Sequence, residues 1–245
     1  MIFELTGTPL RIAGTLHLLP PGRDLPAWVR SAYDWSDAVF VEHSPADFLR
    51  EAQRIDEPLD HVVSPVFWSR LQMFASSLPL PLAGLQRGAA VVLGLGSRLQ
   101  GAPGADQALG DWCARDGKPF GCMEPATELL EALASIGEAQ WLAGLDAEHR
   151  LAGDPRALQA QLQRFYDSWR KGKLDGIVTA STAGLFSVPA IRARLLTGRN
   201  AAWAARYAEP SRPTLVAVGA AHLVGEGSFL QALAQVSGRS VRRLV

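Results

Sequence analysis

Short, continuous apolar runs recur along the chain, separated by longer segments with helical periodicity. Continuous runs of this length are typical of strands that are buried on both faces of a parallel sheet. The hydrophobic pattern therefore predicts strands at residues 10–16, 37–42, 89–95, 118–124, 176–180, 214–220 and 240–245.

The segments between these runs carry signals of helix boundaries. In residues 43–55, Ser44 is placed to cap a helix that has Pro45 at its first position. Residues 154–172 begin with Asp-Pro and end with Gly172, which is also typical of a complete helix. We expect further helices within residues 24–36, 124–145, 188–209 (which can break at Gly198) and 229–236.

Strands and helices alternate at both ends of the chain, whereas residues from about 125 to 210 are mainly helical. This order predicts a single α/β domain spanning residues 1–245. Its mixed, largely parallel central sheet would be built from both ends of the chain, with a helical insertion at about 125–210. The glycine-rich stretch 94–106 matches neither the GxGxxG nor the Walker spacing of phosphate-binding loops, so we interpret it as a connection.

Composition narrows the class of protein. Hydrophobic residues make up 48% and charged residues 20%, as in globular proteins. The 24 basic residues balance the 24 acidic ones, so we expect neither a nucleic-acid partner nor a membrane surface. Cys113 and Cys122 lack metal-binding spacing and are expected to be reduced thiols. Since neither a signal peptide nor an apolar run of about 18 residues is found, we expect a cytoplasmic protein, or a periplasmic one if a leader was removed.

Several residues suited to catalysis or metal binding follow predicted strands, where parallel sheets deliver functional side chains. His17, Glu42, Glu124 and His222 each stand at a strand end, and Asp106 lies in a predicted loop. Two imidazoles with two or three carboxylates are a suitable ligand set for a divalent metal, and equally a suitable set for acid–base catalysis. The pattern alone leaves both open.

Both strand-end histidines belong to a Gly-x-x-His motif that follows an apolar run. The motif glycines, Gly14 and Gly219, would let backbone or ligand approach closely near the strand end. The other three histidines differ: His61 and His149 are expected at the surface, whereas His43 follows Glu42 and could approach the same crevice.

Arg199 and Asn200 lie in a helical segment among apolar residues, where a charged side chain needs a partner. A carboxylate cluster or a substrate carboxylate would satisfy Arg199. Trp203 and Tyr207, one turn apart on the same segment, are most simply interpreted as core residues.

Taken together, these motifs resemble the TraB/GumN family, which also includes the Tiki proteins. The resemblance runs over nearly the whole chain and rests on GTLHLLP (14–20), DAVFVE (37–42), GAD (104–106), GKPFGCMEPATELL (117–130), YDSWRKGKLD (166–175), LLTGRNAAWA (195–204) and VAVGAAHLVGEGSFLQAL (216–233).

The resemblance implies a fold similar to the erythromycin esterase and ChaN-like proteins. It also implies a metal-dependent protease that uses Mn or Co, as described for Tiki proteins, acting on a peptide or small-molecule substrate. By position, His17 and His222 correspond to the two motif histidines and Glu42 to the glutamate after the second strand. Asp106, Glu124, Arg199 and Asn200 correspond to recurrent polar positions.

This sequence departs from the family in two respects: no export signal is found, and GKLD (172–175) stands where the family has GD after its tryptophan motif. Our first hypothesis is a metal-dependent peptidase in which His17, Glu42 and His222 hold a divalent ion, with Glu124 or Asp106 nearby. Glu42 or Glu124 would be its general base and Arg199 would stabilise the oxyanion. The alternatives are a non-catalytic peptide-binding or signalling protein, and a metal-independent esterase-like hydrolase with a histidine base. A serine hydrolase is disfavoured because no GxSxG motif occurs.

Overall fold

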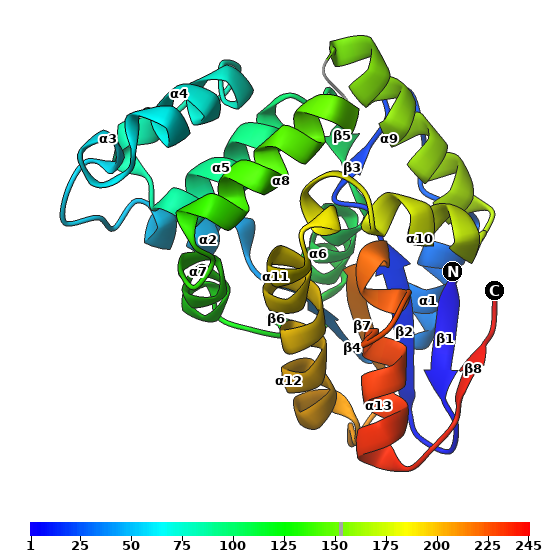
Figure 1. The fold of residues 1–245 in the computed structure, drawn as a ribbon. Helices are drawn as coiled ribbons and strands as arrows, with labels where there is room; N and C mark the ends of the chain where they lie inside the picture. The colour runs from blue at the N-terminus through cyan, green and yellow to red at the C-terminus, as the bar shows by residue number, and fades with distance from the viewer. Residues whose placement is uncertain (152–153) are drawn as a thin grey trace.

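The computed structural model describes residues 1–151 and 154–245, which form an α/β structure around a six-stranded sheet (Figure 1). The strand order is β6-β4-β7-β2-β1-β8. The four strands β6, β4, β7 and β2 run parallel. Next to β2, β1 pairs antiparallel with it, and the edge strand β8 pairs antiparallel with β1. The sheet strands are β1 (Ile2–Leu5), β2 (Leu10–Thr15), β4 (Ala38–Val41), β6 (Phe120–Cys122), β7 (Thr214–Gly219) and β8 (Val241–Arg243).

Both ends of the chain thus build the sheet, as predicted, and only β6 comes from its middle. A two-stranded antiparallel pair, β3 (Leu18–Leu19) and β5 (Ala102–Pro103), lies apart from the sheet. The helices are α1 (Ala27–Trp35), α2 (Pro45–Ala52), α3 (Leu59–Val62), α4 (Pro65–Phe74), α5 (Arg87–Ser97), α6 (Ala105–Asp116), α7 (Ala126–Ala134), α8 (Glu138–Leu151), α9 (Pro155–Arg170), α10 (Leu174–Ser181), α11 (Pro189–Arg192), α12 (Gly198–Tyr207) and α13 (Phe229–Ser237).

Two predicted strands are wrong, because residues 89–95 lie in α5 and residues 176–180 lie in α10. The predicted caps of α2 are confirmed: the Ser44 hydroxyl accepts a hydrogen bond from the Asp47 amide, and Pro45 is the first helical residue. Segment 188–209 stays helical through Gly198. A π-helical turn, Ala193–Thr197, joins α11 to α12 there.

The buried side chains form two clusters. One surrounds the sheet and includes side chains of α1, α6, α12 and α13. The other lies among α2, α4, α5, α7 and α8, which form the helical layer to the left of the sheet in Figure 1. The helical part of the chain therefore begins well before residue 125. Since β4 leads into α2 and β6 into α7, the ends of these strands lie where the two clusters meet.

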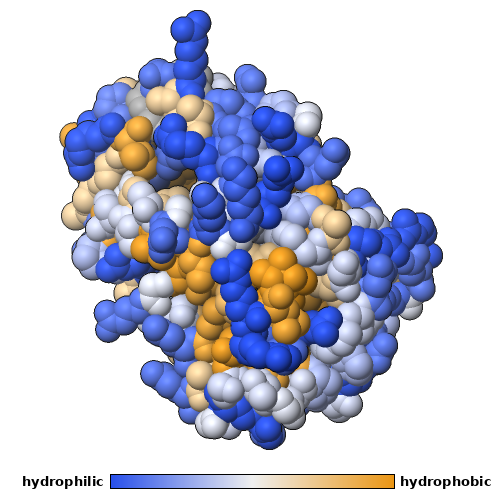
Figure 2. Space-filling model, turned by 90° about the vertical axis from the view of Figure 1, so that its right-hand side faces the viewer, coloured by the Kyte–Doolittle hydropathy of each residue, from blue (hydrophilic) through white to orange (hydrophobic). Residues whose placement is uncertain are grey.

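Polar residues cover most of the face that Figure 2 shows; its largest apolar area, near the centre, is crossed by polar side chains. Both cysteines are free, Cys113 buried and Cys122 half-buried. Across residues 1–151 and 154–245, no helix is both long and apolar enough to cross a membrane.

Candidate functional site

The carboxyl ends of the parallel strands bring the predicted polar residues together. His17 follows β2, Glu42 follows β4 and Glu124 follows β6, and His222 lies in a short 3₁₀ turn, Ala220–Leu223, directly after β7. The helices supply the other three residues, Asp106 from the first turn of α6 and the Arg199–Asn200 pair from the start of α12. Asp106 is therefore helical, and its prediction as a loop residue was wrong.

The ring of His17 is held by Asp106. Its Nδ1 lies 2.8 Å from Asp106 Oδ2, and the Thr15 hydroxyl donates to the other carboxylate oxygen, Oδ1, at 3.0 Å. Because an ionised carboxylate only accepts hydrogen bonds, Nδ1 of His17 carries a proton here. The His17 Nε2 atom is left facing the site.

The ring of His222 is held in the same manner by Asn200. Its Nδ1 lies 2.7 Å from Asn200 Oδ1, and the Asn200 amide donates to the Gly227 carbonyl at 2.8 Å. Both side chains are buried. Each motif histidine is thus anchored at Nδ1 by a side chain from a helix.

The two remaining ring nitrogens approach the same carboxylate oxygen. Glu42 Oε1 lies 3.9 Å from His17 Nε2 and 3.6 Å from His222 Nε2, and it accepts a hydrogen bond from the Gly219 amide at 2.6 Å. Gly219 is the glycine of the second Gly-x-x-His motif. A Cβ there would stand 3.0 Å from Glu42 Oε1 and 3.3 Å from His17 Nε2, so the missing side chain keeps this point open.

Arg199 links the two buried glutamates. Its Nη2 donates to Glu42 Oε2 at 2.7 Å and to Glu124 Oε1 at 2.6 Å, and its Nε also donates to Glu124 Oε1, at 2.8 Å. Glu124 Oε2 accepts from the indole of Trp203 at 3.1 Å, and that ring also lies under the guanidinium of Arg199. The carboxylate partner expected for Arg199 is therefore present within the chain.

The π-helical turn directly precedes the helix that carries Arg199 and contacts its side chain. A π turn inserts one residue into a helix and often occurs at functional sites. The Leu195 carbonyl, within this turn, accepts a hydrogen bond from Arg199 Nη1 at 3.1 Å. The same Nη1 lies 3.4 Å from His222 Nε2, so Arg199 contacts two glutamates and a histidine of the cluster at once.

The cluster is open on the side of His17. The His17 side chain is 59% exposed, whereas those of Glu42, His222 and Arg199 are 4%, 5% and 10% exposed. Any substrate would therefore meet His17 first.

Burial and neighbouring charge shift the pKa of each group. Desolvation lowers the pKa of His17, but the hydrogen-bonded charge of Asp106 and the charge of Glu42 outweigh it and raise that pKa to about 9. Burial lowers the pKa of His222 to about 3 despite the nearby Glu42. Burial opposes ionisation of Glu42, but His222, Arg199 and His17 hold its pKa well below the usual range. Burial raises the pKa of Glu124, and Arg199 offsets only part of this effect.

The Asp106 contact can be tested by titration. Asp106→Asn removes the charge that stabilises protonated His17, so the pKa of His17 is expected to fall from about 9 towards its ordinary value of 6.5 or below. Nuclear magnetic resonance of ¹⁵N-histidine-labelled protein measures this shift directly. Asp111→Asn, an exposed change on the same helix, is the control and should leave the His17 titration in place. An unshifted pKa in Asp106→Asn would contradict the assignment.

Sequence reasoning missed part of the site. Trp203 was interpreted only as core, but it also contacts Glu124, Arg199 and the ring of His222, at a centroid distance of 4.7 Å. Its position four residues after Arg199 was the available signal, since such residues share a helix face. The hydroxyl of Thr15 had no distinguishing signal. His43 is half-buried beside Phe48, where the charge of Glu42 acts on its ring; His61 and His149 are exposed, as predicted.

A divalent metal would need its ligands at definite distances from one another. Within the described residues, no three His, Cys, Asp or Glu side chains stand as a ready-made metal cluster. Ligands about 2.1 Å from a metal in tetrahedral arrangement lie about 3.4 Å apart. The gaps of 3.9 and 3.6 Å from the histidine nitrogens to Glu42 Oε1 exceed this by a few tenths of an ångström. Anchoring of Nδ1 is a feature of metal-binding histidines, and both rings would have to move closer to Glu42 Oε1 to share an ion with it.

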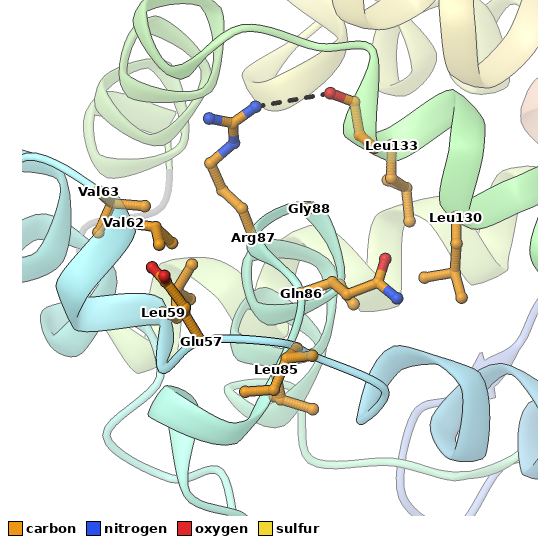
Figure 3. Close-up of a pocket in the computed structure, with 13 residues that line it drawn as sticks. Glu57, Leu59, Val62, Val63, Leu85, Gln86, Arg87, Gly88, Leu130 and Leu133 are labelled. Atoms are coloured by element: carbon orange, nitrogen blue, oxygen red, sulfur yellow. Dashed lines mark hydrogen bonds between the residues drawn. The ribbon is translucent and has the colours of Figure 1, made fainter.

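A separate hollow of about 240 Å³ lies in the helical layer (Figure 3). Its apolar lining comes mainly from Leu59, Leu85, Leu130 and Leu133, and its polar rim includes Arg87. None of the predicted site residues lines it. This hollow is distinct from the polar cluster at the strand ends.

Fold and site together define an α/β protein with a polar cluster assembled around two Gly-x-x-His histidines from opposite ends of the chain. A family model described as TraB/PrgY/gumN matches residues 2–243, so the chain belongs to the TraB/PrgY/gumN family. Comparisons with curated proteins and with solved structures gave no match.

Proposed function

We propose that this protein is a metal-dependent hydrolase that acts on peptides. The observation that carries the proposal is the convergence of His17 Nε2 and His222 Nε2 on Glu42 Oε1, with both rings anchored at Nδ1. Peptides are the substrate class that the resemblance to Tiki proteins implies.

His17, His222 and Glu42 would hold the divalent ion, Mn or Co by the same resemblance. When bound, such an ion lowers the pKa of a water molecule and polarises a carbonyl group. Glu42 is suited to this role because Arg199 contacts its Oε2, while Oε1 faces the histidines. Asp106 and Asn200 orient the two rings as outer partners of metal-binding histidines commonly do.

Arg199 supplies positive charge where an oxyanion would develop during acyl transfer. Glu124 is better suited to hold Arg199 than to serve as a general base. Both of its oxygens are already occupied, by Arg199 and by Trp203, and it is buried. Glu42, whose Oε1 faces both histidines, is then the glutamate that would stay at the reaction centre, as a ligand of the ion.

A metal-independent hydrolase is the second candidate, and one observation favours it. His17 is exposed and paired through Nδ1 with Asp106, which is how a histidine base is oriented in hydrolases that use no metal. In this mechanism Nε2 of His17 would accept the proton of the attacking water above about pH 9, where the ring is neutral. The Arg199 guanidinium, 3.4 Å from His222 Nε2, would then be the cation of the site.

Metal binding tests the first candidate. We expect chelator-treated protein to bind Mn²⁺ or Co²⁺ in titration calorimetry. His17→Ala and His222→Ala should each weaken this binding by more than about 100-fold, since loss of a ligand exceeds the loss of an outer partner. His61→Ala removes an exposed histidine and is the matched control.

Peptide-library cleavage followed by mass spectrometry, with and without Mn²⁺, separates the candidates. Cleavage that needs the ion and both histidines supports the proposal. Cleavage in chelator that stops only in His17→Ala supports the metal-independent mechanism. Saturable peptide binding without turnover under either condition supports a non-catalytic protein. Absence of ion binding in the unaltered protein, or histidine variants that bind the ion as tightly as the unaltered protein, contradicts the proposal.

A further inference from the structure

Asn200 has a fixed orientation at the base of the site. Its amide nitrogen donates to the Gly227 carbonyl at 2.8 Å, and its oxygen lies 2.7 Å from His222 Nδ1. Turning the amide over would set its oxygen against the Gly227 carbonyl oxygen, two acceptors with no proton between them. Because Asn200 is buried, water cannot relieve that repulsion. Asn200 therefore presents an acceptor to His222.

An acceptor at Nδ1 decides which nitrogen of neutral His222 carries the proton. A neutral imidazole has one N–H, and hydrogen-bond partners determine its position. With Asn200 Oδ1 at 2.7 Å, the proton lies on Nδ1 and Nε2 keeps its lone pair. That lone pair faces Arg199 Nη1 at 3.4 Å and the centre of the cluster.

The backbone around Asn200 is arranged to keep this contact. Gly227 has a φ of +70°, which favours glycine, and a Cβ there would press on the side chain of Thr197 at 2.5 Å. Thr197 is the last residue of the π-helical turn, three positions before Asn200. Close packing of Gly227 on the turn thus brings the Gly227 carbonyl within reach of Asn200.

We infer that Asn200 is a positioning residue that locks His222 in the Nδ1–H tautomer, with the Gly227 carbonyl as its own anchor. The use of the freed Nε2 lone pair as a metal ligand rests on the proposed function, but the tautomer itself does not. Asp106 fixes His17 with a charged acceptor, whereas Asn200 fixes His222 with a neutral one.

Long-range ¹H–¹⁵N spectra of the metal-free, ¹⁵N-histidine-labelled full chain report the tautomer of each ring, and His222→Gln assigns the signal. The unaltered protein should show His222 protonated at Nδ1. Asn200→Ala removes the acceptor, and the Nε2–H form should become populated. Asn200→Asp keeps an acceptor and should retain the Nδ1–H form even though its contact with Gly227 is lost.

Gln231→Ala is the matched control, because the Gln231 side chain holds Gly227 from its amide side without touching His222. It should leave the tautomer unchanged. In the same preparations, Asn200→Ala should weaken Mn²⁺ or Co²⁺ binding by about 10- to 100-fold, as loss of an outer partner does, and Asn200→Asp should weaken it less.

The inference is overturned if His222 of the unaltered protein is protonated at Nε2, or if Asn200→Ala keeps the Nδ1–H form. Should Asn200→Ala fail to fold, the unaltered protein and Asn200→Asp still decide the question: an Nε2–H signal in either contradicts the lock. If His222 is in the Nδ1–H form but the protein binds no metal, the proposed function is contradicted, whereas this inference is not.

Discussion

Replacing Arg199 with leucine is expected to lower the free energy of unfolding by about 3–5 kcal/mol, the usual cost of removing one partner from a buried ion pair. Arg199 contacts Glu42 and Glu124, both of which are buried. Leucine leaves Glu124 without its cation and leaves Glu42 with His17 as its neighbouring charge. Urea unfolding followed by circular dichroism measures the loss.

The pH dependence of this loss has a definite sign. Without Arg199, the pKa of Glu124, already raised by burial, rises further. A carboxyl group whose pKa is raised in the folded state contributes to stability at pH values below its unfolded-state pKa. This contribution is lost as the pH rises through its folded-state pKa. The depressed pKa of Glu42 stabilises the unaltered protein above its ordinary value of 4.5, and this contribution is lost as pH falls. The free energy of unfolding that Arg199→Leu loses should therefore be largest near neutral pH and become smaller as the pH approaches 4.5.

Two variants control this experiment. Arg206→Leu removes a surface arginine whose pair with Glu128 is exposed (43% and 39%), and should cost less than about 1 kcal/mol. Adding Glu124→Gln to Arg199→Leu removes one stranded charge and should recover part of the stability. If Arg199→Leu costs no more than Arg206→Leu, the guanidinium does not hold the two glutamates together.

The sheet was largely predictable because its strands are short apolar runs, but the same pattern misled at two places. Residues 89–95 and 176–180 are apolar over the length of a strand, and a buried helix can show the same run. In α5, Ala89, Ala90 and Val91 are all buried among other helices, so the helix lacks a polar face that would reveal its period. Strand β1 was missed. It has only four residues and depends on pairing with β2 and β8.

Residue types at strand ends predicted the members of the site, whereas its internal contacts could not be predicted. A glutamate after a strand indicates a position, but which cation it meets depends on a helix more than 70 residues away, as for Glu124 and Arg199. The π-helical turn has no sequence signal beyond a helix that continues through Gly198. The proton position on His222 depends on the Gly227 carbonyl, which fixes the orientation of the Asn200 amide. Gly227 lies in a loop, and no sequence motif links it to Asn200.

Gly104→Ala is expected to destabilise the protein by about 3 kcal/mol, at the upper end of what overpacking usually costs. A Cβ at Gly104 would overlap the Leu16 carbonyl oxygen and lie 2.6 Å from the His17 carbonyl carbon. These are backbone atoms, so no side-chain rotation can relieve the clash. The Gly104 and Ala105 amides also donate to the His17 and Leu16 carbonyls, each at 3.0 Å, and these bonds would have to lengthen.

The same change should disturb the site, because Gly104 lies two residues before Asp106 and packs on the backbone of His17. Separating Asp106 from His17 removes the charge that raises the pKa of His17, so that pKa should fall from about 9 in the variant as well. Gly96→Ala is the matched control: nothing lies within 4 Å of that Cβ position in α5, and alanine should stabilise the helix by about 0.5–1 kcal/mol. A Gly104→Ala protein with unchanged unfolding and an unchanged His17 titration would show that the chain crossing at Gly104 does not set the Asp106–His17 contact.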